Sequence, residues 1–289
     1  MGVKHSHLAG TWYSGDAAQL REQIDGWLQE ATVSGAGAGR MGAVIVPHAG
    51  YRYSGRAAAA AYACARGGAA AYRRAVVVAP SHAAAFRGVA LLDVDAFGTP
   101  LGEIAVDREA VAALARAPLC AVRPSAYRDE HALEIQLPFL QRALLGVCVV
   151  PVLVGEVDAA EAATVAATLE ALADGATLFV VSSDFVHYGA RFAYLPFSAT
   201  GPVQVAAALR TLDMGAIERI CAGDAAGFTA YVEATGATIC GRTPIAVFLT
   251  LHRQRTQGIL LTYYTSLDVT GDYEHSVSYA SIGFPGEGA

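Results

Sequence analysis

Three histidines in this sequence each stand a few residues beyond a short β-branched run. The runs and their histidines are 43–46 with His48, 75–78 with His82, and 177–181 with His187. Neutral imidazole is the commonest protein ligand of transition metals and a common general base. A single histidine after a strand is more often a turn residue or a hydrogen-bonded core group, but three in equivalent positions predict a shared pocket.

Cys240 adds a second kind of candidate ligand. The segment ATICGRTPIAVFL places it in a Cys-Gly turn before a predicted helix that begins near Pro244. The N–H groups of a helix N-terminus and the charge of Arg242 favour thiolate over thiol, and a thiolate binds soft metals. The alternative is a buried, inert cysteine. We adopt that interpretation for the four cysteines in apolar surroundings, Cys64, Cys120, Cys148 and Cys221.

The segment SSDFVHYG brings Asp184 within three residues of His187. If the turn is helical, both side chains face the same space. A carboxylate beside a histidine fixes its tautomer and raises its basicity, an arrangement shared by general bases and by the supports of metal ligands. The alternative is that Asp184 caps a short helix and that His187 is a partly exposed side chain. Spacing leaves both interpretations open.

The segment DEHALEIQLPFL places four ionisable residues at the start of a predicted amphipathic helix: Asp129, Glu130, His131 and Glu134. Asp129 or Glu130 is expected to stabilise the helix N-terminus. His131 and Glu134 lie three positions apart, so they share one helical face and could reach the pocket instead. The sequence does not fix the direction of that face.

Composition limits the classes of function. With 54% hydrophobic and 16% charged residues, the 289-residue chain can bury a large core, and residues 1–289 are expected to form a single domain. The net charge is -6 and the basic residues are scattered, which argues against nucleic acid or anionic lipid as a partner.

The cellular location is also an expectation from sequence. Five cysteines at irregular spacings do not form a disulfide framework, which favours a reducing compartment. The first residues lack the apolar core of a signal peptide, and no apolar run approaches the ~20 residues of a membrane span. We therefore expect a soluble, cytoplasmic protein without a membrane partner.

The candidate residues need a scaffold, and the order of apolar patterns predicts one. Strand patterns at 43–46, 75–78, 147–154 and 177–181 alternate with helical patterns around 20–28 and at 57–65, 107–116, 130–145, 158–173 and 202–220, with a glycine loop at 35–40. This alternation predicts a single α/β domain with a largely parallel central sheet flanked by helices. Two β-rich runs in 259–284, around a Thr-Gly-Asp turn, predict an antiparallel pair at the sheet's edge. In open α/β sheets, ligands bind beyond the carboxyl ends of the strands, where the three histidines stand.

Several blocks of the sequence resemble, in fixed order, the Memo family (mediator of cell motility). They are AGTWYSGDAAQL, PHAGYRYSGRAAAAAY, APSHAAAFRG, DEHALEIQLPFL, SSDFVHYG, CGRTPIAVFL and DVTGDYEHSVSYASIGF, and together they span nearly the whole chain. The resemblance implies a fold similar to the class III extradiol (LigB-like) dioxygenases. Those enzymes hold Fe(II) with two histidines and a carboxylate and use another histidine as acid and base.

The resemblance also implies roles for particular residues. Two metal-binding histidines fall on His48 and His82, and the third ligand falls on Cys240. The acid/base histidine falls on His187 with Asp184 near it. A separate implication is that His131 lies close to the substrate. In prokaryotes, Memo-like proteins are associated with an AMMECR1-like protein and a radical-SAM protein, which implies a shared pathway of unknown substrate.

The third ligand departs from the dioxygenase pattern. A soft thiolate in place of a hard carboxylate shifts metal preference toward Cu(I), Zn or a differently tuned Fe, and activated oxygen can oxidise a thiolate. Catechol cleavage therefore does not follow from the fold. The first interpretation is an Fe- or Cu-dependent oxidoreductase of unknown substrate.

Two alternatives use the same cleft without catalysis. One is a ligand- or peptide-binding module, and the other is a protein that handles iron or copper. Aromatic residues near the predicted pocket could line such a cleft, although packing is their more usual role. They are Trp12, Tyr13, Tyr51, Tyr53 and Tyr188.

Overall fold

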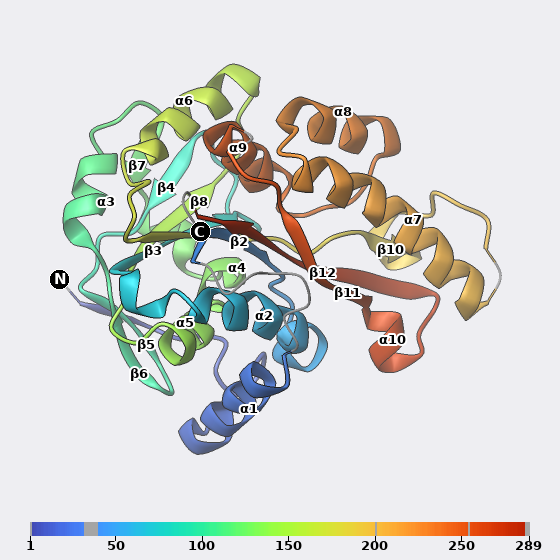
Figure 1. The fold of residues 1–289 in the computed structure, drawn as a ribbon, viewed down its shortest axis with the longest axis horizontal. Coiled ribbons are helices and arrows are strands. Elements are labelled where there is room, and N and C mark those ends of the chain that lie inside the picture. The colour runs from blue at the N-terminus through green and yellow to red at the C-terminus, as the bar shows by residue number, and fades with distance from the viewer. Residues whose placement is uncertain (1, 32–39, 200, 254, 287–289) are drawn as a thin grey trace.

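A mixed β-sheet runs through the centre of the computed structural model, which describes residues 2–31, 40–199, 201–253 and 255–286 (Figure 1). Nine strands of the described residues belong to this sheet. In spatial order they are β10 (His187–Gly189), β12 (His275–Pro285), β2 (Met41–Val46), β9 (Thr177–Ser182), β3 (Arg74–Pro80), β8 (Cys148–Val154), β4 (Val89–Leu91) and β7 (Cys120–Val122), and β11 (Ile259–Thr265) pairs with β12 beside this path.

The four central strands β2, β9, β3 and β8 are parallel. They are buried along nearly their whole length, which is typical of parallel strands covered by helices on both faces. Val46 of β2 pairs with Ser182 of β9, so the carboxyl ends of these strands meet at one end of the sheet. The predicted α/β class with a parallel centre is confirmed. The loops after β2, β3 and β9 consequently begin close together.

Helices cover both faces of the sheet (Figure 1). On one face α2 (Tyr51–Arg66) packs on β2 and β12, beside α1 (Ala17–Glu30) and α5 (Leu137–Ala143). On the other, α9 (Arg242–His252) packs on β3 and β9, beside α6 (Ala159–Glu170) and α8 (Ala225–Thr235). The other helices are α3 (Arg108–Leu114), α4 (His131–Glu134), α7 (Pro202–Cys221) and α10 (Ser266–Thr270), with 3-10 turns at Ala69–Ala71, Pro124–Tyr127 and Ala190–Phe192.

The single helix predicted over 130–145 is two helices, α4 and α5. Pro138 has no N–H to donate to the carbonyl of Glu134, so the hydrogen-bond ladder of one continuous helix cannot form there. Between the two helices, the N–H of Gln136 donates to Leu133 O at 3.1 Å in the tighter 3-10 pattern. The short helix that carries His131 is therefore separated from the helix that packs beside α2.

The C-terminal strand pair is antiparallel and lies at an edge of the sheet, as predicted, because β11 has β12 as its one partner among the described strands. β12 pairs with β10 near its start and with both β11 and β2 at Ile282 and Gly283, so it lies between β11 and β2 there. The predicted turn contains a short helix, α10, which ends at Gly271 with a φ of 78°. Because β12 is 11 residues long, it reaches from the edge strand β10 into the centre of the sheet.

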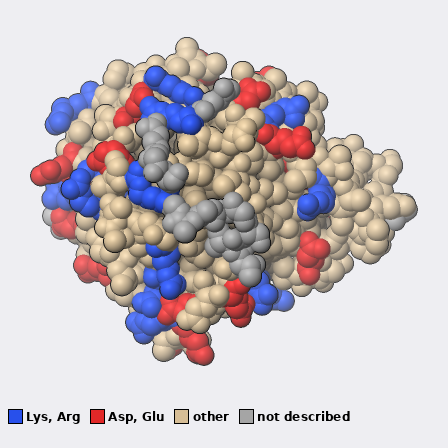
Figure 2. Space-filling view, viewed as in Figure 1, with Lys and Arg blue, Asp and Glu red and all other residues tan. Residues whose placement is uncertain are grey.

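A second, small sheet was not predicted. It joins β1 (Val3–His5), β5 (Ala96–Thr99) and β6 (Gly102–Ala105). The glycine loop expected at 35–40 lies outside the described residues except for Arg40. No helix in the described part of the chain has both the length and the apolar character needed to cross a bilayer. On the face seen in Figure 2, positive and negative side chains are interspersed and neither forms a continuous patch.

Candidate metal centre

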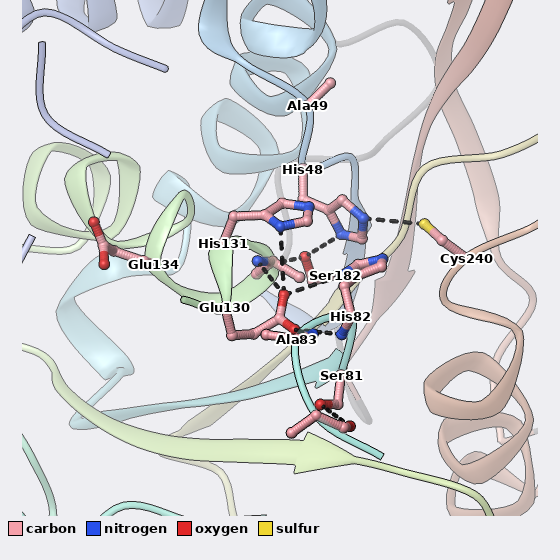
Figure 3. A network of polar contacts seen from close by, with 12 residues as sticks. His48, Ala49, Ser81, His82, Ala83, Glu130, His131, Glu134, Ser182 and Cys240 are labelled. Carbon is pink, nitrogen blue, oxygen red and sulfur yellow. Dashed lines mark hydrogen bonds and ion pairs between the residues drawn. The ribbon is translucent and has the colours of Figure 1, made fainter. Parts of the chain in front are cut away.

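The loops at the carboxyl ends of the central strands bring histidines together, as the sequence predicted. His48 lies two residues beyond β2 and His82 two residues beyond β3, while His131 begins α4 (Figure 3). One ligand atom from each of these three residues lies within 4.8 Å of those of the other two. Nitrogen atoms that share one metal ion at about 2.1 Å are at most about 4.2 Å apart, so this group is close to a metal-binding arrangement.

The tautomer of His48 follows from its hydrogen bonds. Ser182 donates its hydroxyl proton to Ala132 O at 2.6 Å, so its oxygen accepts from His48 Nδ1 at 2.9 Å. The lone pair of His48 is therefore on Nε2. Burial, together with the nearby His131 and His82, lowers the pKa of His48 well below its ordinary value. A neutral imidazole with a free Nε2 is the form that binds a metal.

Glu130 holds the other two histidines. Its Oε1 is 3.0 Å from His82 Nδ1 and 3.6 Å from His131 Nδ1. It also caps α4 by accepting from Ala132 N at 2.9 Å, so the predicted capping role is correct but incomplete. Burial raises the pKa of Glu130, but the hydrogen bonds with His82 and Ala132 outweigh this effect and lower it to about 2. Glu130 is thus a buried carboxylate that orients the rings and leaves Nε2 of His82 for a ligand.

Cys240 lies at the side of His48 that faces away from Ser182 (Figure 3). Its Sγ is 3.0 Å from His48 Nε2, the atom that would bind a metal. Burial and the neighbouring Asp184 raise the pKa of the Cys240 thiol, which is the reverse of the effect expected from the start of α9. The thiol therefore donates to Nε2 in this state. Its role as the third metal ligand stays a prediction, because the close histidine group contains His131 in that position.

His187 also lines this site, with its tautomer fixed by carbonyl groups rather than by Asp184. His187 Nδ1 lies 2.9 Å from Phe185 O and 3.1 Å from Thr238 O, and both are acceptors. Nδ1 therefore carries the proton, and Nε2 has the lone pair of a general base.

Asp184 lines the same cavity as His187, and its hydrogen bonds are made to the loop that carries His48. Its Oδ1 accepts from the N–H groups of His48, at 2.7 Å, and Ala49, at 3.3 Å. No helix follows Asp184 directly, so it does not cap one either. Burial raises its pKa, while the nearby His187 and these N–H groups act in the opposite direction. Asp184 fixes the loop that carries His48, and its predicted catalytic role stays a prediction.

Glu134 points away from the histidines (Figure 3). Its Oε1 accepts from Ser6 Oγ at 2.5 Å and from Leu8 N at 3.1 Å, and its Oε2 pairs with Lys4 Nζ at 3.2 Å. The three-residue spacing from His131 therefore does not bring Glu134 to the pocket, because the N-terminal segment supplies its partners. Glu134 instead anchors the N-terminal segment.

A cavity of about 440 Å³, which we call the inner cavity, is lined by His48, His82, His131, His187, Trp12 and Phe192 among others. The Trp12 ring lies against His131 with 4.5 Å between ring centroids. Of the aromatic residues noted in the sequence, Trp12 and Tyr53 line this cavity. Tyr51 and Tyr188 pack elsewhere: Tyr51 donates to Ile135 O at 2.9 Å, and Tyr188 stacks on Phe197.

Several residues that support the histidines were not predicted. Ser182 and Thr238 position His48 and His187 through a hydroxyl and a carbonyl, and Gln136 donates to Ser182 Oγ at 3.0 Å. Ser182 stands at the last position of β9, at the same end of the sheet as the histidines. Polar residues are common at such positions, so this placement alone did not mark it as part of the site. Their partners become evident only in three dimensions.

The first prediction concerns Glu130. Glu130→Gln is expected to weaken metal binding by roughly 10- to 100-fold, because the neutral amide cannot hold the N–H of His82 as strongly. Competition with a chelator of known affinity measures the change. Glu134→Gln is the matched control, since it alters another buried glutamate of the same segment that does not contact His48, His82 or His131. Equal metal affinities of the two variants would contradict the role of Glu130.

A buried carboxylate also supports the segment that carries His187. Asp213 of α7 is fully buried, accepts from Val186 N at 3.1 Å and accepts from the Tyr263 hydroxyl at 2.8 Å. Burial raises the pKa of Asp213 from 3.8 to about 6, although these donors act in the opposite direction. Between these two pH values the folded state keeps a proton that the unfolded state releases, so stability falls as the pH rises.

The second prediction uses this pH window. The free energy of unfolding of the unmodified protein, minus that of Asp213→Asn, is expected to fall by roughly 3 kcal/mol from pH 4 to pH 6. Above pH 6 the difference should be constant. Urea unfolding at several pH values measures it. A difference that does not change with pH would show that Asp213 has an ordinary pKa in the folded protein.

Comparison with known proteins places this chain in a family. A model described as Memo-like protein matches residues 4–283. Protein MEMO1 of Xenopus laevis is 34% identical over 288 residues, which cover 94% of each chain, and Protein MEMO1 of Homo sapiens is 32% identical with the same coverage. Protein memo-1 homolog of Caenorhabditis elegans is 33% identical over 94% of this chain and 80% of its own.

A solved structure shows the same fold. Uncharacterized protein JW3007 from Escherichia coli K12 superposes with a TM-score of 0.53 over 85% of this chain and 100% of its own, at 15% identity. At that identity the likeness concerns the fold alone. The sequence relatives and the family match, which extends over the strands and loops that build the histidine group, show that the chain belongs to the Memo-like family.

Proposed function

We propose that this protein binds a redox-active transition metal, Fe or Cu, and uses it for an oxidation–reduction reaction on a small molecule in the inner cavity. The observation that carries the proposal is the group of His48, His82 and His131 within 4.8 Å of one another, beside a fourth histidine in the same cavity. The family membership agrees with it but does not name a reaction.

The donor set fits such a metal. Imidazole nitrogen suits Fe, Cu and Zn, and the adjacent Cys240 sulfur suits Cu(I) and Zn. Nδ1 of His48 donates to Ser182 and Nδ1 of His82 to Glu130, which are the outer contacts that metal-binding histidines normally make. When bound, the ion would supply Lewis acidity and one-electron chemistry.

The protein residues supply the remaining functions. His187 offers the Nε2 lone pair to a substrate proton, since its Nδ1 is committed to two carbonyl groups. Trp12 and Phe192 provide apolar walls that exclude water and bind a flat molecule. Glu130, Ser182 and Asp184 hold the histidine rings and loops in place before a substrate binds, which avoids the cost of ordering them later.

The test begins with metal analysis. Protein purified without chelator is expected to contain about one Fe or Cu per chain by plasma mass spectrometry. Oxygen consumption is then measured with a panel of catechols and other aryl compounds. Absence of stoichiometric metal, both as purified and after reconstitution, would refute the proposal.

Binding of a ligand or peptide without catalysis is the second candidate, and the size of the binding space agrees with it. The inner cavity adjoins a much larger one with aromatic walls, described below, which suits ligand binding with or without a reaction. Stoichiometric metal without oxygen consumption would support this candidate. Release of that metal to a chelator within seconds would favour a protein that handles iron or copper.

A further inference from the structure

A second cavity adjoins the histidine site. It has a volume of about 1000 Å³, and we call it the outer cavity; Trp12, Trp27, Arg52, Tyr53, Arg56 and Asp268 are among the residues that line it. Thr11, Trp12 and Tyr53 line both cavities, so the two spaces meet along these residues. A molecule bound in the outer cavity can therefore extend past Trp12 to the histidines.

The walls of the outer cavity are held in place by specific contacts. Trp27 packs directly on the backbone of α2 at Gly55, where an added Cβ would lie 2.3 Å from Trp27 Cζ3. Tyr264, which also lines this cavity, donates its hydroxyl proton to Tyr53 O at 2.8 Å and accepts from Ala57 N at 3.2 Å. Aromatic rings fixed in this way favour a flat ligand, because little side-chain entropy is lost on binding.

The charges on the walls are unbalanced. Arg52 and Arg56 lie one turn apart on α2, both exposed, and no described acidic residue forms an ion pair with either of them. The acidic residue of the lining, Asp268, is already engaged: its Oδ2 accepts from Thr265 N at 2.7 Å and from Thr265 Oγ1 at 3.0 Å. Although the net charge of the protein is -6, Arg52 and Arg56 together form a local positive site that attracts an anion.

We infer that the outer cavity binds the anionic end of an elongated, flat small molecule, with a carboxylate or phosphate at Arg52 and Arg56 and its other end at the histidines. This inference rests on the proposed function in treating the histidine group as the reacting end. It adds a substrate class, an aryl compound with a terminal anion. It also adds two specificity residues on α2 that the metal site does not use.

The two tryptophans of the chain, Trp12 and Trp27, both line the outer cavity, so tryptophan fluorescence reports its occupancy directly. Two matched pairs of probes are titrated. They are 4-phenylbutyrate against 4-phenylbutyramide and 2-phenylethyl phosphate against 2-phenylethanol. At least one anion is expected to bind about tenfold or more tightly than its neutral partner, and the better pair identifies the acid as carboxylate or phosphate.

Arginine variants test the assignment to α2. Arg56→Gln is expected to weaken binding of the preferred anion about tenfold and to remove most of its advantage over the neutral probe. Arg66→Gln is the matched control, because Arg66 is an exposed arginine of the same helix that lines neither cavity. Its affinity should equal that of the unmodified protein. Equal weakening by both variants, or equal binding of anionic and neutral probes, would overturn the inference.

Titration of metal-loaded and chelator-treated protein separates this inference from the proposed function. Metal content is measured on the same samples. A protein that holds no metal but still binds the anion through Arg56 would refute the metal proposal and support the outer cavity as an anion site. Stoichiometric metal without anion preference would leave the metal proposal intact and overturn the inference alone.

Discussion

Exchange of His82 for alanine is expected to lower the affinity for a transition metal by roughly 100-fold or more, so that the purified protein no longer contains it. His82 is the ligand whose removal should disturb the fold least, because its side chain is 34% exposed whereas His48 is buried. Plasma mass spectrometry and chelator competition measure the loss. His5→Ala, which removes an exposed imidazole of β1, is the control and should keep its metal.

Metal analysis of variants, together with the absorption spectrum of the cobalt-loaded protein, decides between two candidates for the third ligand. His131 belongs to the close histidine group, whereas Cys240 is adjacent to His48 Nε2. Co(II) bound by a thiolate absorbs strongly in the near ultraviolet, and this band should be present in the cobalt-loaded protein and absent in Cys240→Ser if sulfur is a ligand. If His131 is the ligand, His131→Ala should lose the metal and Cys240→Ser should keep it. Retention of metal by His82→Ala would contradict the site as a whole.

Replacement of His187 by glutamine is expected to reduce oxygen consumption by about 100- to 10 000-fold while the metal content is unchanged. The reason is the fixed tautomer: with Nδ1 held by Phe185 O and Thr238 O, Nε2 is the atom that can receive a substrate proton. A glutamine amide can occupy the space but cannot act as a base near neutral pH.

The control for His187 is a variant that keeps the imidazole but removes hydrogen bonds that hold its backbone in place. Thr238 donates its hydroxyl proton to His187 O at 2.8 Å and accepts from His187 N at 2.9 Å, so Thr238→Val should lower turnover by a smaller factor. Full turnover in His187→Gln, with metal bound, would show that another group moves the proton.

The sequence predicted the site at the level of loops, and the limits of that prediction have physical causes. His48, His82 and His187 were found because parallel strands bring their carboxyl ends together, which is a property of the fold class and not of the individual residues. The direction of His131 could not be predicted, because two adjacent faces of α4 differ only in what packs against them. Glu134 faces Ser6 and Glu130 faces His82, although both are glutamates of one short segment.

Two predictions that rested on the local sequence, one for Asp184 and one for Cys240, differ from the structure in part. Asp184 and His187 both line the inner cavity, but the chain between them is not helical, and Asp184 accepts hydrogen bonds from His48 N and Ala49 N instead of pairing with His187. Similarly, the start of α9 was expected to lower the pKa of Cys240, but desolvation has the larger effect on a thiol at this depth. In both cases the tertiary environment outweighs a local rule.

The position of β12 between β2 and β10 has a consequence for the synthesis of the protein. β2 ends at Val46 and its partner β12 begins at His275, so the ribosome adds the intervening residues during about ten to fifty seconds. Throughout that time one edge of β2 has no partner strand and can pair with other chains. Nascent chains of this protein therefore have a period of exposure in which chaperone binding would be most useful.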